Sequence, residues 1–323
     1  MSQQRKNRLY LWAGILTALH LRLWLQKGYL FRNAHNIDNN IGYTDPEISS
    51  LLIKKKILED YESLLIHDDQ QLYDHLRRMI EQPPAMKAHH HPINPDIPAW
   101  INVTSYNRTE SNLRALCSST YKGTFVEIGA QDGLWLSNTW WLEATMGWRG
   151  LLVEGDPKNY ANLRESPRLS PTLPTCACEG KSARMEKMLR IKHPAPITSD
   201  IGKTQRGRTM LAKFATPTDL YLGETWNATC YPLMSVLAAS GYKKIDLLVF
   251  DTAGGGYEMM EDFLLSNDEL GNPYKVQVIL YQDSSVLRSN TLPQDVQNFG
   301  YTYVLIDSSH HLLIHKSMTF SVV

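Results

Sequence analysis

Two short stretches, Phe125-Val-Glu-Ile-Gly-Ala-Gln-Asp-Gly133 and Gly150-Leu-Leu-Val-Glu-Gly-Asp-Pro157, decide the fold of this chain. Each contains an apolar run, typical of a buried β-strand, with an acidic residue at or near the end of the run. The first has Gly129 and Gly133 just past the strand, and the second ends its run at Glu154, 21 positions after Gly133. This layout is typical of a doubly wound α/β sheet that binds a nucleoside, because the glycines let the turn approach a ligand and the second acid accepts ribose hydroxyls.

The same residues discriminate between cofactors. A dinucleotide-binding turn reads Gly-x-Gly-x-x-Gly, so that a pyrophosphate can lie at a helix N-terminus. Here Gln131 stands at the second glycine position, and Glu127 lies two residues before Gly129. A nicotinamide oxidoreductase is therefore the weaker alternative, which an NADH titration would test. The pattern Glu-x-Gly-x-x-Asp-Gly resembles the first motif of S-adenosylmethionine (SAM)-dependent methyltransferases.

The resemblance extends beyond this motif. The blocks that carry it are Leu136-Ser-Asn-Thr139, Gly147-Trp-Arg-Gly150, Tyr231-Pro-Leu-Met-Ser-Val-Leu237 and Ile245-Asp-Leu-Leu-Val-Phe-Asp251, and with the two opening stretches they resemble the FkbM-type methyltransferase family. The resemblance implies a Rossmann-like α/β class I methyltransferase sheet with a C-terminal antiparallel hairpin, over residues 119–323. It also implies SAM as the cofactor, and a likeness to the animal, Star-like branch, which includes membrane-anchored proteins.

The expected cofactor-binding residues are the acids and glycines of these motifs. They are Glu127, Gly129, Asp132, Gly133 and Glu154. By resemblance, an acid at Glu127 binds the cationic amino acid end of SAM. The five residues agree in type and spacing, which favours a cofactor role over glycine turns that merely end strands. No metal site is expected.

Methyl transfer to a hydroxyl group is an in-line displacement that needs a positioned nucleophile and a base. The resemblance implies an oxygen of a sugar or small molecule as the acceptor. Asp251, at the end of a predicted strand, is the catalytic candidate, as base or orienting group, and an acid that only caps the next turn is the structural alternative. His310 and His311 are further candidate bases, with exposed surface histidines as the alternative.

The loop after this strand departs from the family pattern. The family typically reads Asp-Val-Glu-Gly-small-Glu there, whereas this chain reads Asp251-Thr-Ala-Gly-Gly-Gly-Tyr-Glu258. Ala253 and Gly256 therefore replace carboxylates, and Gln282 replaces an acid that is usual on the next strand. These replacements favour an alternative function, a catalytically degenerate methyltransferase fold that binds protein cargo in the secretory pathway. The three adjacent glycines also predict positive φ angles in this loop.

Strand and helix patterns alternate through the domain. The first strand is expected to end near Ile128, the third to lie within residues 171–178, and the fifth to cover residues 276–282. Ser137 or Asn138 is expected to cap the helix that follows the first strand.

Two regions precede the domain, residues 1–30 and residues 31–118. Residues 9–25 form an apolar run that His20 and Arg22 interrupt. The run is at the lower limit of length for a spanning helix, so a signal anchor competes with a surface or packed helix and with a cleaved signal peptide. An anchor would make the chain a single-pass type II membrane protein with a cytosolic tail and a domain facing the ER/Golgi lumen. Residues 31–118 are expected to form helices and a Pro-rich linker.

The sequons and cysteines are relevant to the cellular compartment in which the domain lies. The Asn-x-Thr sequons begin at Asn102, Asn107 and Asn227. Used sequons would make the chain a glycoprotein of the secretory lumen. The four cysteines are Cys117, Cys176, Cys178 and Cys230. They allow three full pairings, among which the sequence does not choose, and buried free thiols are the alternative.

The composition sets ordinary limits. The chain has 323 residues, of which 43% are hydrophobic and 20% charged, and its formal net charge is zero. This balance is typical of a globular protein, and without a basic domain no nucleic-acid partner is expected. The expected partners are a small-molecule or glycan acceptor, a membrane through the N-terminal segment, and protein cargo under the alternative function.

Overall fold

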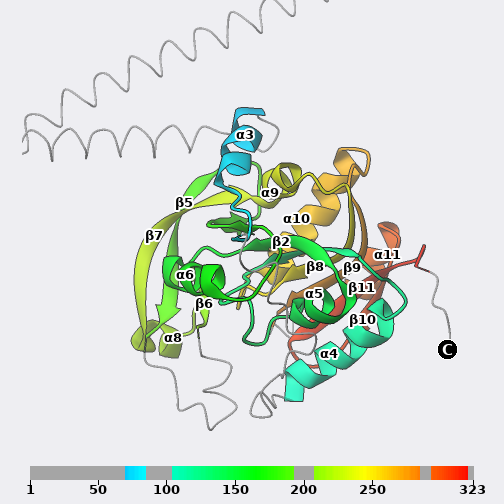
Figure 1. Cartoon of the computed structure of the whole chain (residues 1–323), viewed down its shortest axis with the longest axis horizontal. Helices are drawn as coiled ribbons and strands as arrows, with labels where there is room; N and C mark the ends of the chain where they lie inside the picture. Colours follow the sequence, from blue (N-terminus) through cyan, green and yellow to red (C-terminus); the bar gives the residue numbers. More distant parts are fainter. Residues whose placement is uncertain (1–69, 85–103, 193–206, 284–291, 319–323) are drawn as a thin grey trace, which may run out of the picture. The chain divides into compact units, whose positions relative to one another are not determined.

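The strand that was predicted to end near Ile128 is the centre of a seven-stranded sheet with the order β10-β11-β9-β8-β1-β2-β3 (Figure 1). The structure is a computed structural model, and it describes residues 70–84, 104–192, 207–283 and 292–318. Within the sheet, β11 runs antiparallel to β9 and β10, and the other neighbours are parallel. The order and the reversed strand confirm the predicted Rossmann-like class I methyltransferase fold with a C-terminal antiparallel hairpin.

The elements have the following bounds. The large sheet contains β1 (Thr124–Ile128), β2 (Arg149–Val153), β3 (Thr172–Leu173), β8 (Lys244–Phe250), β9 (Lys275–Gln282), β10 (Tyr301–Leu305) and β11 (His310–His315). A second sheet, with the order β4-β7-β5-β6, contains β4 (Cys176–Cys178), β5 (Arg184–Ile191), β6 (Thr209–Leu211) and β7 (Gly223–Pro232). The helices are α3 (Gln70–Met79), α4 (Thr104–Cys117), α5 (Trp140–Met146), α6 (Pro157–Glu165), the 3₁₀ helix η2 (Ala212–Phe214), α8 (Pro217–Leu222), α9 (Leu233–Ser240), α10 (Gly256–Glu269) and α11 (Leu292–Asn298).

Helices cover both faces of the large sheet, which explains why its central strands are apolar on both sides. Val126 and Ile128 of β1 pack in a core with α3, α9, α10 and α11. Phe125 of the same strand packs on the opposite face, in a core with α4, α5 and α6. Successive residues of a strand alternate between faces, so Glu127 points to the α5 side. Figure 1 shows α9 and α10 on one side of the sheet and α4 and α5 on the other.

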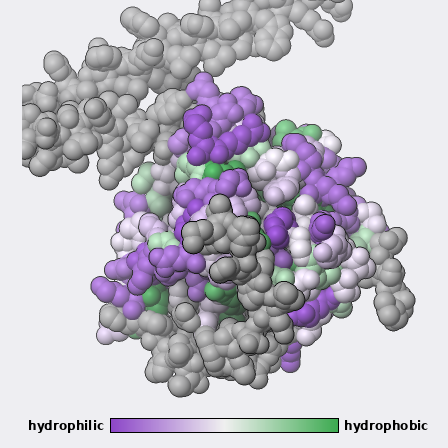
Figure 2. All heavy atoms as spheres, in the orientation of Figure 1, coloured by the Kyte–Doolittle hydropathy of each residue, from purple (hydrophilic) through white to green (hydrophobic). Residues whose placement is uncertain are grey.

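Helices α3 and α4 precede residue 119 and still pack against the sheet. Leu72 and Leu76 of α3 are fully buried in one core, and Leu113 of α4 is fully buried in the other. The outward side of α3 carries hydrophilic side chains (Figure 2). Amphipathic helices of this kind are stabilised mainly by the face that they bury.

The third strand, β3, lies within residues 171–178 as predicted, and the same stretch also contains β4, which pairs with β7 of the second sheet. One local prediction was wrong. The N-cap of α5 is Thr139, without a side-chain cap bond, rather than Ser137 or Asn138. Those two side chains bind acids at the ends of β1 and β8 instead.

Several predictions fall on residues outside the described ranges. They include the apolar run at residues 9–25, the Pro-rich linker and the sequon at Asn102. In the part of the chain that the structure describes, no helix is both long and apolar enough to span a bilayer.

Candidate functional site

The carboxyl ends of β1, β2 and β8 meet at one edge of the large sheet, where open α/β sheets bind their ligands. A cavity at this edge is lined by residues of both sheets. Its lining includes Gly129 and Gln131 after β1, Glu154 and Gly155 after β2, Met188 and Leu211 of the second sheet, and Asp251, Thr252, Ala253, Gly254 and Gly255 after β8. The structure therefore brings Gly129, Glu154 and Asp251 together, as the sequence predicted, and adds a wall from the second sheet.

Glu154 follows β2 directly and is 4% exposed. Its Oε2 accepts a hydrogen bond from the backbone N–H of Gln131 at 2.8 Å, and its Oε1 accepts one from the N–H of Asp156 at 2.7 Å. Burial raises the pKa of Glu154 to about 7, against the lowering effect of these two bonds. Each carboxylate oxygen can accept a second hydrogen bond, so the group can also bind hydroxyls from the cavity.

The chemistry of the lining fits SAM. Three carboxylates, from Glu154, Glu179 and Asp251, line the cavity, and none of the described lining residues is Lys, Arg or His. An acidic lining suits a cationic sulfonium and would repel a pyrophosphate, which favours SAM over a dinucleotide. Apolar side chains such as Val153 and Leu211 offer a surface for an adenine ring.

The two motif glycines are required by contacts within the protein. Gly129 has φ +88°, and a Cβ atom there would lie 2.1 Å from the backbone oxygen of Asp251. Gly133 has φ +77°, and its Cβ would lie 2.5 Å from Cδ1 of Leu163. Residues that carry a side chain rarely adopt such φ angles. Both turns therefore require glycine because of contacts within the protein, whether or not a ligand is bound. Of the two, Gly129 also lines the cavity.

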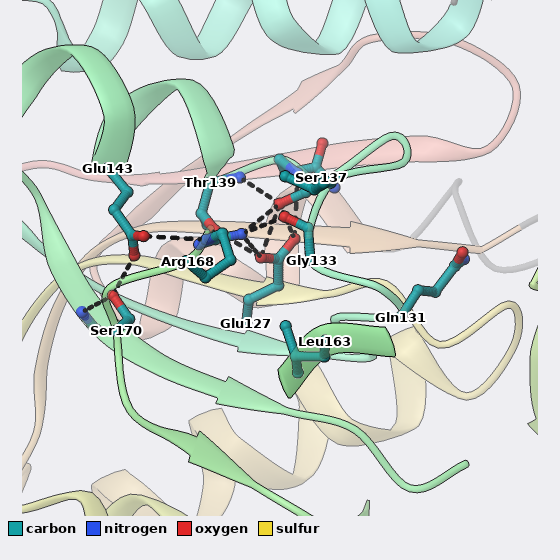
Figure 3. A network of polar contacts seen from close by, with 12 residues as sticks. Glu127, Gln131, Gly133, Ser137, Thr139, Glu143, Leu163, Arg168 and Ser170 are labelled. Carbon is teal, nitrogen blue, oxygen red and sulfur yellow. Dashed lines mark hydrogen bonds and ion pairs between the residues drawn. The ribbon is translucent and has the colours of Figure 1, made fainter. Parts of the chain in front are cut away.

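Glu127 lies in a buried polar network (Figure 3) and is not among the residues that line the cavity. Its carboxylate accepts hydrogen bonds from Oγ1 of Thr139 at 2.5 Å, from Oγ of Ser137 at 3.1 and 3.2 Å, and from the N–H of Asn138 at 3.1 Å. Burial raises its pKa, and the nearby Arg168 opposes that rise. In this structure the group holds the loop between β1 and α5, and its predicted role at the amino acid end of SAM stays a prediction.

Arg168 is the centre of that network and was not predicted from the sequence. Its side chain is 1% exposed and lies 3.8 Å from Glu127 and 3.3 Å from Glu143. It also donates to the carbonyl oxygen of Gly133 at 2.8 Å and to Oγ1 of Thr139 at 2.8 Å. One buried cation thus connects two carboxylates to the motif loop (Figure 3).

Asp132 caps a turn. Its Oδ1 accepts from the backbone N–H groups of Leu134 at 3.0 Å and Trp135 at 2.7 Å, a common role for aspartate in turns. It borders a second hollow, beside Lys158 and Arg190, rather than the cavity described above. Its predicted cofactor role remains untested.

Asp251 lies directly after β8 and lines the cavity. Nδ2 of Asn138 donates to its Oδ2 at 3.2 Å. Burial raises the pKa of Asp251 to about 6, the positive charge of His310 lowers it, and the negative charge of Glu127 raises it further. A carboxyl group in this position changes its charge near neutral pH, as a proton-transfer group requires.

The loop after Asp251 is fixed by packing. Gly254 and Gly255 have positive φ, as the glycine run predicted, whereas Gly256 begins α10 instead; Ala253 also has positive φ, which was not predicted. Cβ atoms at Gly254 and Gly255 would lie 2.7 and 2.6 Å from the side chain of Phe214. The loop therefore lies close against η2, with no space for longer side chains at the two glycines.

Asp156 ties the second sheet to the large one, a role that the sequence did not reveal. It is fully buried and caps α6 by accepting from the N–H of Lys158 at 2.8 Å. It also binds the guanidinium of Arg190 on β5 and accepts from Oγ1 of Thr209 on β6 at 2.8 Å. Burial alone would raise the pKa of Asp156, but these bonds hold that pKa below its usual value. The Asp-Pro pair at the start of α6 was a signal for the cap, but not for the link between sheets.

The cysteines divide into one disulfide and two free thiols. Cys176 of β4 and Cys230 of β7 are bonded, so the structure has none of the three full pairings and combines one disulfide with the free-thiol alternative. Cys117 and Cys178 are free and buried. Cys176 also lines the cavity, so the disulfide stabilises one of its walls.

Comparisons with known proteins identify a family. The model of the methyltransferase FkbM domain family matches residues 127–289, just over half of the chain. A comparison with curated proteins found no match.

Solved structures that resemble the chain include two of METTL16 and one of a precorrin methyltransferase. The METTL16 methyltransferase domain has 10% identity and a TM-score of 0.37 and covers 64% of this chain and 66% of its own. The N-terminal domain of human METTL16 in complex with SAH has 11% identity, a TM-score of 0.34 and coverages of 69% and 72%. Precorrin-6y C5,15-methyltransferase from Geobacter metallireducens has 12% identity, a TM-score of 0.34 and coverages of 71% and 100%. These likenesses are distant, so the fold assignment rests on the strand order.

The family match covers the motif loop, the acid after β2 and the strand that ends at Asp251. SAM is the cofactor that this family implies, and the acidic cavity fits it. The chain therefore belongs to the FkbM methyltransferase domain family, and it is a SAM-dependent methyltransferase.

Proposed function

We propose that the chain transfers the methyl group of SAM to a hydroxyl oxygen of a sugar or another small molecule. The observation that carries this proposal is the placement of Asp251, a carboxyl group with a pKa raised to about 6, at the end of an acidic cavity. Transfer to a hydroxyl needs a group that orients the oxygen or accepts its proton, and Asp251 can do either.

Separate residues would hold the two ends of the cofactor. When bound, SAM supplies an electrophilic methyl group on a sulfonium. Glu154, with free acceptor capacity on both oxygens, would bind the ribose hydroxyls. The carboxylates in the cavity lining stabilise the positive charge of the sulfonium.

We place this activity in the secretory lumen, on a type II membrane protein of the Star-like branch. The Cys176–Cys230 disulfide supports this location, because disulfides persist mainly in oxidising compartments. Asn227, the start of one sequon, is exposed on β7. In another sequon, Thr109 is 1% exposed on α4, so modification at Asn107 would have to precede folding. The predicted anchor at residues 9–25 remains part of the proposal.

A second function, cargo binding by a degenerate methyltransferase fold, is favoured by the loop after Asp251. A Cβ at Gly256, where the family pattern has a carboxylate, would lie 2.6 Å from the backbone oxygen of Gln282. An acid cannot be accommodated there without a backbone shift. Under this alternative the cavity either binds SAM without using it or binds no cofactor, and in both cases no methyl group is transferred.

Calorimetric titration of the full chain with SAM and with its demethylated product, SAH, tests the first step. Micromolar binding is expected for the wild type and should be lost in Glu154→Ala, with Glu269→Ala, an exposed acid on α10, as the matched control. Transfer of tritium from [methyl-³H]SAM to a panel of methyl glycosides tests the second step. Binding without transfer would favour the cargo-binding alternative, and no binding by the folded chain would refute the cofactor site.

A further inference from the structure

The turn between β10 and β11 holds a histidine against a carboxylate. Nδ1 of His310 lies 2.9 Å from Oδ1 and 3.1 Å from Oδ2 of Asp307. Oδ1 of Asp307 also accepts from the backbone N–H groups of Ser309 at 2.9 Å and of His310 at 3.0 Å. The side chains of His310 and Asp307 are 17% and 11% exposed. The turn thus fixes the imidazole ring while leaving part of it accessible.

Sheet register places this pair at the same edge as the cavity. His310 pairs with Gln282, the last residue of β9, and β9 lies beside β8, which Asp251 follows. Leu312, two residues after His310, and Val249, two residues before Asp251, pack in the same core on the α4 and α5 face. Because side chains two apart share a face, His310 and Asp251 both point to that face.

Strand order also fixes which side of Asp251 the histidine occupies. The cavity is bordered by β1 and β2 on one side of β8, whereas β9 and β11 lie on the other. Asp251 therefore stands between the cofactor cavity and His310. A methyl acceptor that reached Asp251 from outside the cavity would lie beside His310.

The charges around Asp251 agree with this geometry. A positive charge on His310 would lower the pKa of Asp251, as the register of β11, β9 and β8 leads one to expect. Glu127 acts in the opposite direction, and its own charge is balanced by Arg168. Asp251 in turn contributes to the raised pKa of Glu154.

The hydrogen bonds determine which ring nitrogen is available. A carboxylate only accepts hydrogen bonds, so Asp307 requires a proton on Nδ1 of His310. The neutral ring then carries its lone pair on Nε2, which no hydrogen bond reaches within the described residues. This arrangement, with one nitrogen held by an acid and the other free, is that of a histidine base oriented by a carboxylate.

We infer that His310 and Asp307 form a catalytic dyad, in which Nε2 of His310 takes the proton of the acceptor hydroxyl and Asp251 orients that hydroxyl. The inference rests on the proposed hydroxyl methylation and names its base. The hydroxyl oxygen forms a bond to the methyl carbon as the carbon–sulfur bond breaks, and that bonding pair stays on sulfur. The hydroxyl proton passes to Nε2, and the imidazolium, stabilised by Asp307, later releases it to water. Asp307 is a positioning residue, since it acts through His310.

The tautomer of His310 gives a test that does not depend on turnover. In the full chain with ¹⁵N-labelled histidine, long-range ¹H–¹⁵N correlation spectra distinguish the two neutral tautomers, and the signals missing in His310→Gln assign the residue. We expect the Nδ1–H tautomer in the wild type and its loss in Asp307→Ala. An Nε2–H tautomer in the wild type would overturn the dyad, because the base would then carry no lone pair at the acceptor.

Kinetics test the same residues with [methyl-³H]SAM and the methyl glycoside panel. His310→Gln should lower kcat about 100-fold or more, the usual scale of general base catalysis, and leave the Kd of SAM unchanged. Asp307→Asn should lower kcat less, and Asp307→Glu should restore part of the loss. His315→Gln is the matched control, because His315 lies on the same strand and its Nδ1 contacts exposed Ser317.

The outcomes separate the two proposals. No transfer by the wild-type chain refutes the proposed function and the dyad with it. If His310→Gln transfers the methyl group at the wild-type rate, the dyad is refuted and the proposed function is not. An equal loss in His315→Gln would also refute it, because the effect would then come from general damage to β11.

Discussion

Replacing Glu154 with glutamine should change how the stability of the fold depends on pH. The pKa of Glu154 is raised from 4.5 to about 7 in the folded chain, chiefly by burial. The folded state therefore holds its proton at pH values where the unfolded chain has released it. Stability falls as pH rises from 4.5 through 7, because the folded state binds more protons than the unfolded state in this window.

The size of the effect follows from the shift. One pKa unit corresponds to about 1.36 kcal/mol, so the wild type loses about 3 kcal/mol of stability through this group by pH 8. Glu154→Gln cannot ionise and lacks this loss. Its free energy of unfolding relative to the wild type should rise by about 2 to 3 kcal/mol between pH 5 and pH 8.

Urea denaturation of the full chain at the two pH values, followed by tryptophan fluorescence, measures this difference. Glu269→Gln is the matched control, because the side chain of Glu269 is 66% exposed and pairs only with exposed Lys181 among the described residues. A difference between Glu154→Gln and the wild type that stays constant with pH would refute the reasoning. Loss of SAM binding in the same variant would show that the destabilising carboxylate is retained for the cofactor.

Three further predictions follow from packing and charge. Arg168→Met should destabilise the fold by about 3 to 5 kcal/mol, because it leaves two buried carboxylates without their cation, while Lys181→Met at an exposed pair should cost less than about 1 kcal/mol in the same urea assay. Gly256→Ala should cost about 1 to 3 kcal/mol, since its Cβ would lie 2.6 Å from a backbone oxygen, and an unchanged melting temperature would contradict that contact. Cys230→Ser opens a loop with a sequence separation of 54 and should cost about 4 kcal/mol, an effect that reductant should reproduce in the wild type but not in the variant.

Local sequence patterns predicted the large sheet because its strands are continuous apolar runs that end at recognisable residues. Ile128 ends β1 as expected, and β9 covers Lys275–Gln282, close to the predicted residues 276–282. Gly241 adopts the left-handed conformation at the end of α9, with φ +77°. In these cases the residue type and its immediate neighbours determine the local conformation.

The second sheet could not be predicted in the same way, because its pairings join distant parts of the chain. β5 pairs with β7 from Arg184 opposite Cys230 to Ile191 opposite Gly223. The residues of β5 mix charged and apolar types without a regular alternation, which is also compatible with a loop that is partly exposed. Only the pairing, together with the Asp156–Arg190 link, shows that this sheet forms a wall of the cavity.

The candidate site, like the fold, combines residues that the sequence pointed to with contacts that it did not reveal. Glu154, predicted to bind the cofactor, and Asp251, the predicted catalytic residue, line one cavity, because the carboxyl ends of parallel strands meet at one edge. The sequence did not reveal that Glu127 is held by Arg168, since the two lie 41 positions apart in the sequence and no motif contains Arg168. Acids in a motif can bind a cofactor or support the loop that binds it, and only the packing distinguishes these roles.

The loss of carboxylates after β8 has a physical consequence for catalysis. Gly256 packs against the backbone of Gln282, and Gly254 and Gly255 pack against Phe214, so an acid cannot enter at Gly256 without a shift of the backbone. In the dyad that we infer, Asp251 orients the hydroxyl and the base comes from another element at this edge. The turn between β10 and β11 presents His310 there, held by Asp307 and on the same sheet face as Asp251. Under this inference the departure from the family loop and the presence of the His310–Asp307 pair are parts of one arrangement. Methyl transfer by the wild type distinguishes an active site from a fold that has lost its chemistry, and the rate of His310→Gln then shows whether the base has moved to this turn.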